Sequence, residues 1–290
     1  MILLLGSSGY VGTSFQEFFI RKNINYLPVS RKDLNYYDSS TIVDFIKDNH
    51  IKYLINAAGY TGKPNVDACE NDKHNTLMGN AVLPGILREA CERAEILFGH
   101  VSSGCIYSGK KDNGDGFIET DKPNFSFRTN NSSFYSGTKA LGEEILKGAE
   151  NCYIWRLRIP FNEVDSPRNF ITKLLNYDKL LEAENSISHL GEFTEAAWES
   201  INQEIKPGIY NITNTGSVKT SEVVEMIKEI LNPKKQFCYF SNEEEFMKLA
   251  AKTPRSNCVL DNSKLLDAGI HVSSAKEAIE GSLLNWSRGQ

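Results

Sequence analysis

The hydrophobic and polar positions of the first 160 residues follow two patterns that alternate along the chain. Short apolar runs of strand length occur at 2–5, 25–30, 52–56, 95–102 and 152–158. Longer stretches between them place apolar side chains on one face of a helix, at 10–22, after Ser39 or Ser40, at 81–94 and at 132–149. Strands that alternate with helices predict an α/β protein with a doubly wound parallel sheet.

The alternation is less regular after Pro160. A strand is predicted at 208–213, and helices are predicted near 168–181, at 220–231 with a cap from Thr220 or Ser221, at 242–250 and at 274–287. We therefore predict a large α/β domain at 1–160 and a lobe at 161–290 that is mostly separate. One segment near 185–215 is expected to return to the main sheet.

Composition and charge exclude several classes of function. The chain has 290 residues and a formal net charge of -5. Since basic residues are not in excess, neither nucleic acid nor an anionic membrane is predicted as a partner. The apolar N-terminal run stops at Gly6, too short for a signal sequence or a membrane span, so we expect a cytoplasmic protein. The six cysteines include no C-x-x-C pair, so no metal site is predicted.

A glycine motif follows the first predicted strand. The segment GSSGYVG at 6–12 has the spacing G-x-x-G-x-x-G and leads directly into a predicted helix. Gly6 permits a tight turn, Gly9 lets the backbone approach a pyrophosphate, and Gly12 lets the helix pack closely on the sheet. The alternative is a purely structural turn. In this context we predict a Rossmann-type dinucleotide site, which is completed by Ser8, Tyr10 and Val11.

The ends of the next two strands also bear on the cofactor. Ser30 and Arg31 stand where an acidic residue would accept the ribose 2′-hydroxyl of NADH. A basic side chain suits a 2′-phosphate, so NADPH is favoured over NADH, although a solvated basic turn is the alternative. Small residues would let the dinucleotide cross the sheet edge after the strand at 52–56; the residues there are Asn56, Ala57 and Ala58.

Tyr135 and Lys139 form the candidate catalytic pair. They lie four residues apart and so share one face of the helix predicted at 132–149. An ammonium group beside a phenol is expected to lower the phenol's pKa from about 10, so that Tyr135 can exchange a proton with a sugar or steroid oxygen. Ser103 would polarise the same oxygen, and Lys139 would also hold the nicotinamide ribose. The alternative is a packed tyrosine beside a lysine that extends to solvent.

Together these motifs resemble the extended short-chain dehydrogenase/reductase superfamily over the whole chain. Longer strings are similar to the reductase domain of plant UDP-rhamnose synthases, which are bifunctional 3,5-epimerase/4-reductases of nucleoside-diphospho-4-keto-6-deoxyglucose. The strings are NAAGYTGKPNVDACE (56–70), SSGCIYSG (102–109), SFYSGTKA (133–140), PRNFITK (167–173), and PRSN with LDNSKL (254–265). The dTDP-4-dehydrorhamnose reductases are more distant relatives. The resemblance implies a UDP-linked sugar as substrate.

Cys105 is the residue that would distinguish an epimerase from a plain reductase. Inversion at C3 and C5 of a 4-keto sugar needs a base to remove a proton and an acid to return one to the other face. In an extended segment Ser103 and Cys105 would point to the same side, so a Cys105 thiolate could act beside the ketone. GDP-fucose synthases are similar in having a cysteine after the catalytic serine. The alternative is a small buried packing residue.

The acid partner is expected on the smaller lobe. Lys173 is the first candidate, with a solvated helix lysine as the alternative, and His189 is the second, because GDP-fucose synthases carry a histidine in this region. Asn169 resembles a position that hydrogen-bonds the substrate diphosphate. Arg255 resembles an arginine of the C-terminal lobe that pairs with phosphate. A helix-start asparagine and a surface arginine are the respective alternatives.

Three functions follow from the resemblance. The first is conversion of UDP-4-keto-6-deoxy-D-glucose to UDP-L-rhamnose with NADPH. The second is reduction alone, on an epimerised dTDP sugar. The third is a non-catalytic regulatory subunit, because the regulatory subunit of methionine adenosyltransferase resembles dehydrorhamnose reductases; the intact Tyr135–Lys139 pair argues against it. A separate 4,6-dehydratase is the expected pathway partner, since plant relatives carry that domain in tandem, and related reductases are often homodimers.

Overall fold

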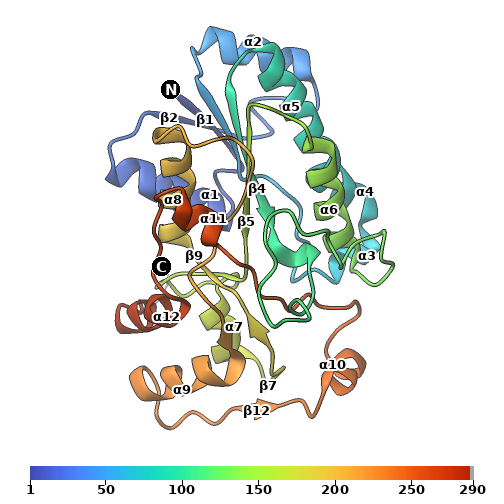
Figure 1. Ribbon diagram of the computed structural model, residues 1–290, viewed down its shortest axis with the longest axis vertical. Coiled ribbons are helices and arrows are strands. Elements are labelled where there is room, and N and C mark those ends of the chain that lie inside the picture. Colours follow the sequence, from blue (N-terminus) through green and yellow to red (C-terminus); the bar gives the residue numbers. More distant parts are fainter. Residues whose placement is uncertain (288–290) are drawn as a thin grey trace.

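The computed structural model describes residues 1–287, and its largest element is a six-stranded parallel sheet (Figure 1). The strands, in spatial order, are β10 (Ile209–Asn211), β5 (Cys152–Leu157), β4 (Leu97–Ser103), β3 (Tyr53–Asn56), β1 (Ile2–Leu5) and β2 (Tyr26–Val29). All neighbouring strands run parallel. The strand order reverses between β1 and β3, and ligands of open α/β sheets bind outside the carboxyl ends of the strands at such a point.

Helices cover both faces of this sheet (Figure 1). One face carries α1 (Tyr10–Arg21) and α8 (Leu190–Asn202), and the other carries α2 (Ser39–Asp48), α5 (Leu83–Arg93) and α6 (Phe134–Leu146). Leu4 of β1 packs in the core with α1, whereas its neighbour Leu3 packs in the core with α2 and α5. Burial on both faces is the reason that the strands are apolar throughout.

The smaller lobe lies below the sheet in the view of Figure 1 and has its own apolar core, which includes Phe161, Ile171, Val223 and Ile279. Its helices are α7 (Phe170–Asn176), α9 (Thr220–Ile230), α10 (Glu243–Leu249) and α12 (Ala275–Leu284). Its short strands pair as β6 (Pro160–Phe161) with β9 (Ser188–His189), β7 (Lys179–Leu180) with β12 (Cys238–Tyr239), and β8 (Glu184–Asn185) with β11 (Val218–Lys219). The remaining helices are α3 (Ala68–Asn71), α4 (Lys73–Leu77) and α11 (Ser263–Asp267).

The strands and helices predicted up to residue 158 are confirmed to within a few residues at each end. The predicted cap of α2 is wrong, because the Asp38 carboxylate accepts hydrogen bonds from the backbone N–H groups of Ser40 and Thr41. The cap predicted for α9 is also wrong, since Thr220 is already helical and Lys219 precedes it. The helix predicted at 168–181 ends at Asn176, because strand β7 begins soon after it. The division of the chain at residue 160 stays a prediction.

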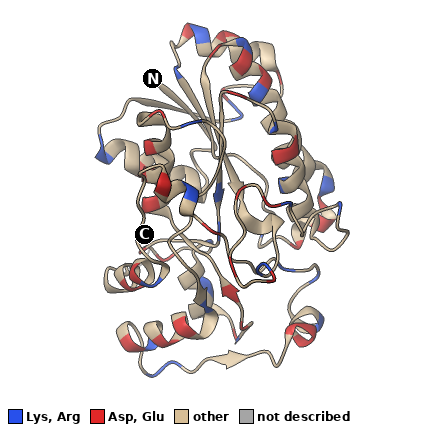
Figure 2. Cartoon of the chain, viewed as in Figure 1, with Lys and Arg blue, Asp and Glu red and all other residues tan. Residues whose placement is uncertain are grey.

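Charged side chains of both signs are scattered over the two parts of the molecule (Figure 2). Neither sign gathers in one region of this view. Among residues 1–287, no helix combines the length and apolar character needed to cross a bilayer. The surface charge therefore does not single out a functional region. The buried polar residues at the carboxyl ends of the strands indicate one instead.

Candidate active site

The glycine loop after β1 is tightly folded against the loop after β3. Gly6 has a φ of +75°, and a Cβ added to it would lie 2.4 Å from the amide nitrogen of Ala58. A Cβ on Gly12 would lie 2.0 Å from the carbonyl oxygen of Gly6. Gly9 is the N-cap of α1 and has no side chain to bond the first amide groups of that helix. The loop therefore offers to a pyrophosphate backbone donors that no side chain caps.

The other residues predicted for this loop have varied surroundings. Ser8 is exposed, while Val11 packs against the core beneath α1. The Tyr10 hydroxyl donates to Asn162 Oδ1 at 3.0 Å, which links the loop to the smaller lobe. Burial and the nearby Glu163 carboxylate raise the pKa of Tyr10, so its phenol stays protonated.

The end of β2 presents an acidic residue that was not predicted to bear on the cofactor. The Ser30 hydroxyl and backbone N–H donate to Asp33 Oδ2 at 2.6 and 3.1 Å. These bonds lower the pKa of Asp33 and hold its carboxylate on Ser30. Arg31 is exposed beside them. The turn thus carries a cation as predicted, but also an anion, one oxygen of which accepts both hydrogen bonds from Ser30.

Asn56 stabilises the turn after β3 from inside. It is fully buried, its amide donates to His100 Nδ1 at 3.1 Å, and its carbonyl accepts from the Ala58 N–H at 3.0 Å. Burial holds the pKa of His100 well below its usual range, so the ring is neutral. Asn56 therefore holds the backbone of Ala57 and Ala58 in place, and this backbone would face the dinucleotide.

Asn80 is a site residue that the sequence reading missed. It lies in a π-helical segment, Met78–Val82, and its amide group bonds both the N–H and the C=O of Tyr60, at 2.9 and 2.8 Å. It also donates to Thr138 Oγ1 of α6 at 3.2 Å. A π turn breaks the helical period, so spacing alone could not have revealed it. Asn80 joins the loop after β3 to the helix that carries Tyr135.

The start of α6 is held by two side chains that set the place of Tyr135. Ser133 caps the helix by accepting from the Ser136 N–H at 3.1 Å. Glu70 of α3 accepts from the Phe134 N–H at 2.7 Å. Tyr135 packs against a buried cluster that contains Cys105. Burial raises the pKa of Tyr135 far above its usual value, and the Cys105 and Cys69 thiols raise it further.

The predicted lowering of the Tyr135 pKa by Lys139 is therefore wrong in this structure. Lys139 is buried, and its Nζ donates to the carbonyl oxygen of Val101 in β4 at 3.0 Å. Burial lowers the pKa of Lys139, while Cys105 and Glu143 oppose that effect. The two side chains share one helix face as predicted, but the ammonium group bonds the end of β4.

Ser103 and Cys105 lie together, though not for the predicted reason. Strand β4 ends at Ser103, and Cys105 lies in a 3₁₀ turn, Gly104–Ile106, so an extended segment is wrong here. Ser103 Oγ accepts from the Cys105 N–H at 3.2 Å and caps this turn. Burial raises the pKa of the Cys105 thiol, and hydrogen bonds with Ser103 and Ser136 act against it, as do the charges of Lys139 and Arg158.

The two acid candidates have different surroundings. Lys173 is half-buried on α7, and burial together with the Arg168 guanidinium lowers its pKa. Arg168 also bonds the Gly62 carbonyl at 2.8 Å, so the segment just before α7 contacts the loop that precedes α3. His189 instead caps α8 and lies 3.3 Å from Glu163. His189 is thus already held by carboxylates, which favours Lys173.

Asn169 is not placed to hold a substrate diphosphate. It is fully buried, and its amide nitrogen donates to the backbone carbonyls of Asn162 and Val164, each at 2.8 Å, and to Asn162 Oδ1. Its side-chain oxygen accepts from the Ile171 N–H as the N-cap of α7. The assignment from the resemblance is therefore wrong, because all the polar atoms of this side chain serve the loop that leads into the helix.

Arg255 is paired with a carboxylate that was not predicted for the site. Its two terminal nitrogens bond the two oxygens of Asp67 at 2.7 and 2.8 Å, and this holds the pKa of Asp67 below its usual range. Thr253 of the same segment donates to Glu70 at 2.9 Å. Because Glu70 also holds the start of α6, the segment around Arg255 is tied to the helix of Tyr135. A diphosphate would have to compete with Asp67 for Arg255.

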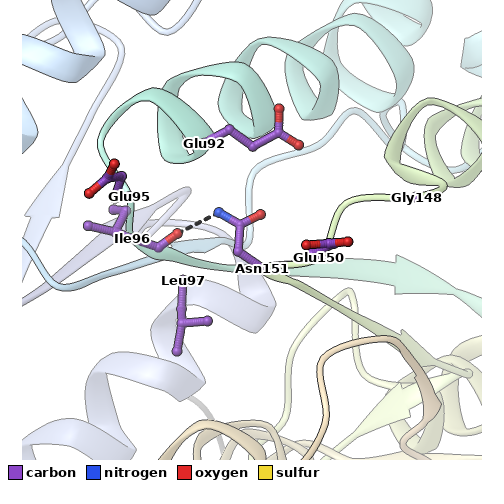
Figure 3. A pocket seen from close by; sticks show the side chains of 7 residues that line it. All are labelled: Glu92, Glu95, Ile96, Leu97, Gly148, Glu150 and Asn151. Atoms are coloured by element: carbon purple, nitrogen blue, oxygen red, sulfur yellow. Dashed lines mark hydrogen bonds between the residues drawn. The ribbon is translucent and has the colours of Figure 1, made fainter.

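A cavity of about 530 Å³ lies at the opposite edge of the sheet (Figure 3). It is lined by Glu92, Glu95, Ile96, Leu97, Gly148, Glu150 and Asn151. These residues surround the amino ends of β4 and β5, and Asn151 donates to the Ile96 carbonyl at 2.7 Å. The cavity is therefore remote from Ser103 and Tyr135, and its three carboxylates disfavour a phosphorylated ligand.

A glycine loop at the strand reversal, with Ser, Tyr and Lys beyond the carboxyl end of β4, defines a dinucleotide-binding α/β protein of the short-chain dehydrogenase/reductase type. The chain belongs to the RmlD substrate binding domain family, whose model matches residues 1–287. The family resemblance predicted from the sequence motifs is thus confirmed.

The chain is also similar to two plant proteins. The chain is 35% identical over 282 residues to the bifunctional dTDP-4-dehydrorhamnose 3,5-epimerase/dTDP-4-dehydrorhamnose reductase of Arabidopsis thaliana, covering 96% of this chain and 90% of that protein. It is 34% identical over 282 residues to a trifunctional UDP-glucose 4,6-dehydratase/UDP-4-keto-6-deoxy-D-glucose 3,5-epimerase/UDP-4-keto-L-rhamnose-reductase of the same plant. That match covers 96% of this chain but 40% of the relative, so the chain spans about two fifths of its length.

Solved structures agree on the fold. The UDP-rhamnose synthase of Acanthamoeba polyphaga mimivirus matches with a TM-score of 0.89 at 24% identity, over 98% of each chain. The dTDP-4-dehydrorhamnose reductase of Bacillus anthracis, in complex with NADP, matches with a TM-score of 0.79 at 19% identity, over 97% of this chain and 96% of the other. These similarities confirm the predicted α/β architecture with its parallel sheet.

Proposed function

We propose that the chain is a nucleotide-sugar 3,5-epimerase/4-reductase that converts UDP-4-keto-6-deoxy-D-glucose to UDP-L-rhamnose. The observation that carries the proposal is the grouping of Cys105 with Ser103, Tyr135 and Lys139 at the carboxyl end of β4. The two Arabidopsis relatives are named for both steps, which supports an epimerase as well as a reductase.

The residues present fit NADPH. Gly6 and Gly12 leave no room for a Cβ, and the uncapped start of α1 offers amide donors for the pyrophosphate. Arg31 would pair with the 2′-phosphate, and Ala57 and Ala58 would let the dinucleotide cross the sheet edge. When bound there, NADPH supplies the hydride for C4.

For the reduction, Tyr135 is the proton donor. Burial keeps its phenol protonated, which is the form that a ketone needs when its oxygen becomes a hydroxyl. Ser103, which caps the turn beside it, would hold the same oxygen with its hydroxyl. Lys139, anchored on the Val101 carbonyl, would orient the nicotinamide ribose and keep a positive charge behind the phenol.

For the epimerisation, the Cys105 thiolate would remove the proton from C3 or C5. The electron pair of the broken C–H bond moves into the C4 ketone, which becomes an enolate held by Ser103 and Tyr135. Lys173 would then deliver a proton to the opposite face of the same carbon. Its pKa, lowered by burial, makes it a better acid than an exposed lysine.

The substrate would come from a separate 4,6-dehydratase, and we propose a homodimer as the working form.

The proposal is tested by supplying UDP-4-keto-6-deoxy-D-glucose and NADPH to the purified chain. The loss of NADPH absorbance reports reduction, and NMR of the product reports the configuration at C3 and C5. The same assay with the dTDP sugar gives the nucleotide preference. If no NADPH is consumed with either sugar, the enzyme proposal is wrong.

The alternative is a reductase that acts on an already epimerised sugar. It is favoured by the burial of Cys105, which raises the pKa of the thiol and disfavours the thiolate. Variants C105A and K173A, incubated with the 4-keto sugar in D₂O, separate the two. As an epimerase, the wild type incorporates deuterium at C3 and C5, and both variants lose this. C152A, which changes another buried thiol at the amino end of β5, keeps it. No incorporation by the wild type would leave the reductase alone. Incorporation by C105A equal to that of the wild type would show that the assignment of Cys105 as the base is wrong.

A further inference from the structure

Arg158, which directly follows β5, is a buried arginine that has no acidic partner among residues 1–287. Its side chain is 7% exposed. Its Nη2 donates to Asn185 Oδ1 at 2.6 Å and to the carbonyl oxygen of Ser256, both of them neutral acceptors. Its Nε is buried and bonds nothing within residues 1–287, and over the same residues no carboxylate lies within ion-pair distance. A guanidinium buried in this way is costly unless an anion meets it.

A neighbouring residue shows what the fold provides when it neutralises such a charge. Arg156, two residues earlier, is equally buried, and three of its contacts join it to the two oxygens of Glu143. The same strand end therefore carries one paired and one unpaired guanidinium. An unpaired guanidinium at this place would stabilise an anion that forms near it during the reaction.

The stem of Arg158 lies along the turn that carries Cys105. A Cβ added to Gly104 would lie 3.5 Å from Arg158 Cδ. Burial raises the pKa values of Cys105, Cys258 and Tyr135, and the charge of Arg158 opposes that rise at all three groups. Among the groups that titrate near it, Arg158 therefore faces thiols and a phenol, each of which becomes an anion when it loses a proton.

We propose that Arg158 is the positioning residue that stabilises the Cys105 thiolate as its counter-cation. The need for a Cys105 thiolate rests on the proposed epimerase function, but the thiolate can be measured without that function. Cys105 faces Ser103 on its own turn, and Tyr135, Ser136 and Lys139 on α6. Cys258, from the C-terminal segment, donates to the Gly104 carbonyl at 3.2 Å. Of these groups only Lys139 is a second cation, and the Val101 carbonyl engages it.

The test measures Cys105 directly, without substrate. Iodoacetamide alkylates thiolates, and mass spectrometry follows each cysteine of the folded chain separately. In R158Q the rate at Cys105 near neutral pH is expected to fall about tenfold, which corresponds to a rise of one unit in the thiol pKa. R158K, which keeps the charge, stays near the wild-type rate. Cys238, which is exposed and distant, is the internal control.

A second variant removes the free charge without removing Arg158. N185D is isosteric and places a carboxylate where Asn185 Oδ1 already bonds Nη2, so the guanidinium gains a counter-ion. The rate at Cys105 is expected to fall in N185D as in R158Q. A loss of packing would instead expose Cys105 and raise its rate. An unchanged or faster rate in N185D, or in a folded R158Q, overturns the proposal.

The result is distinguishable from a failure of the proposed function. If alkylation behaves as expected but the wild type incorporates no deuterium at C3 and C5, Arg158 stabilises the thiolate and the epimerase proposal is wrong. If the wild type incorporates deuterium through Cys105 while N185D and R158Q alkylate normally, the function holds and the role of Arg158 is wrong.

Discussion

The buried ion pair beneath the candidate active site gives the sharpest stability prediction. Glu143 of α6 and Arg156 of β5 are 7% and 2% exposed, with the closest contact at 2.7 Å. Ser102 adds a hydrogen bond to the same carboxylate at 2.6 Å. The substitution E143Q would turn an amide toward the guanidinium and leave Arg156 as a second buried charge without a counter-ion. Removing one partner of such a pair costs about 3–5 kcal/mol of folding free energy.

The chain contains a matched control one residue further along the same helix. Glu144 pairs with Arg128 through two contacts, at 2.6 and 2.8 Å. There the side chains are 43% and 77% exposed, so solvent screens the attraction. E144Q makes the same chemical change and is expected to cost far less than E143Q.

The assay is urea unfolding of the wild type, E143Q and E144Q, followed by circular dichroism and by fluorescence. The reasoning predicts a large loss in the free energy of unfolding for E143Q and a small one for E144Q. Similar losses in the two variants would refute it, because burial would then not determine what these pairs contribute. A stability of E143Q equal to that of the wild type would refute it as well.

Three further predictions follow from individual contacts. In G12A the new Cβ would lie 2.0 Å from the Gly6 carbonyl, so calorimetry should show NADPH affinity reduced by about tenfold or more. The control G281A, which has open space around the new Cβ, should keep the wild-type affinity. Equal affinities in the two variants would contradict the proposed role of the glycine loop in binding NADPH. In Y135F, NADPH oxidation should fall by about a hundredfold or more while deuterium incorporation at C3 and C5 continues, and equal loss of both would remove the proposed division of labour. In D67N the Arg255 ion pair is lost, so unfolding at neutral pH should need less urea than in the wild type. Because the folded pKa of Asp67 lies below its unfolded value of about 3.9, this stabilisation is complete above that pH and disappears as the pH falls through the folded pKa; a difference that persists at acid pH would contradict the assignment.

The motifs that lie within one element could be predicted well. The glycine loop needs a strand, a turn and a helix in succession, and all three are local. Tyr135 and Lys139 share a helix face because helical geometry brings residues four apart together. The strand and helix alternation also required the parallel sheet.

Contacts between distant segments could not be predicted in this way. Asp67 and Arg255 are separated by 188 residues, and Glu70 and Phe134 by 64. Asn169 had a plausible ligand role until the structure showed its polar atoms engaged by the loop around it. The pKa of Tyr135 was expected to be lowered by a neighbour and is instead raised, because burial, a property of the whole fold, outweighs that neighbour.

The sequence by itself determined the fold class and the family, because periodicity, short-range spacing and motif strings carry that information. It also supplied the candidate residues Ser103, Cys105, Tyr135 and Lys139. The tertiary structure alone decided which groups meet and in what protonation state. It set Lys139 on the Val101 carbonyl and Arg255 on Asp67. It also set Arg158, which no carboxylate of residues 1–287 pairs with, beside the turn of Cys105. The physical reason is that burial and charge depend on every segment that packs around a side chain, and those segments come from all parts of the chain.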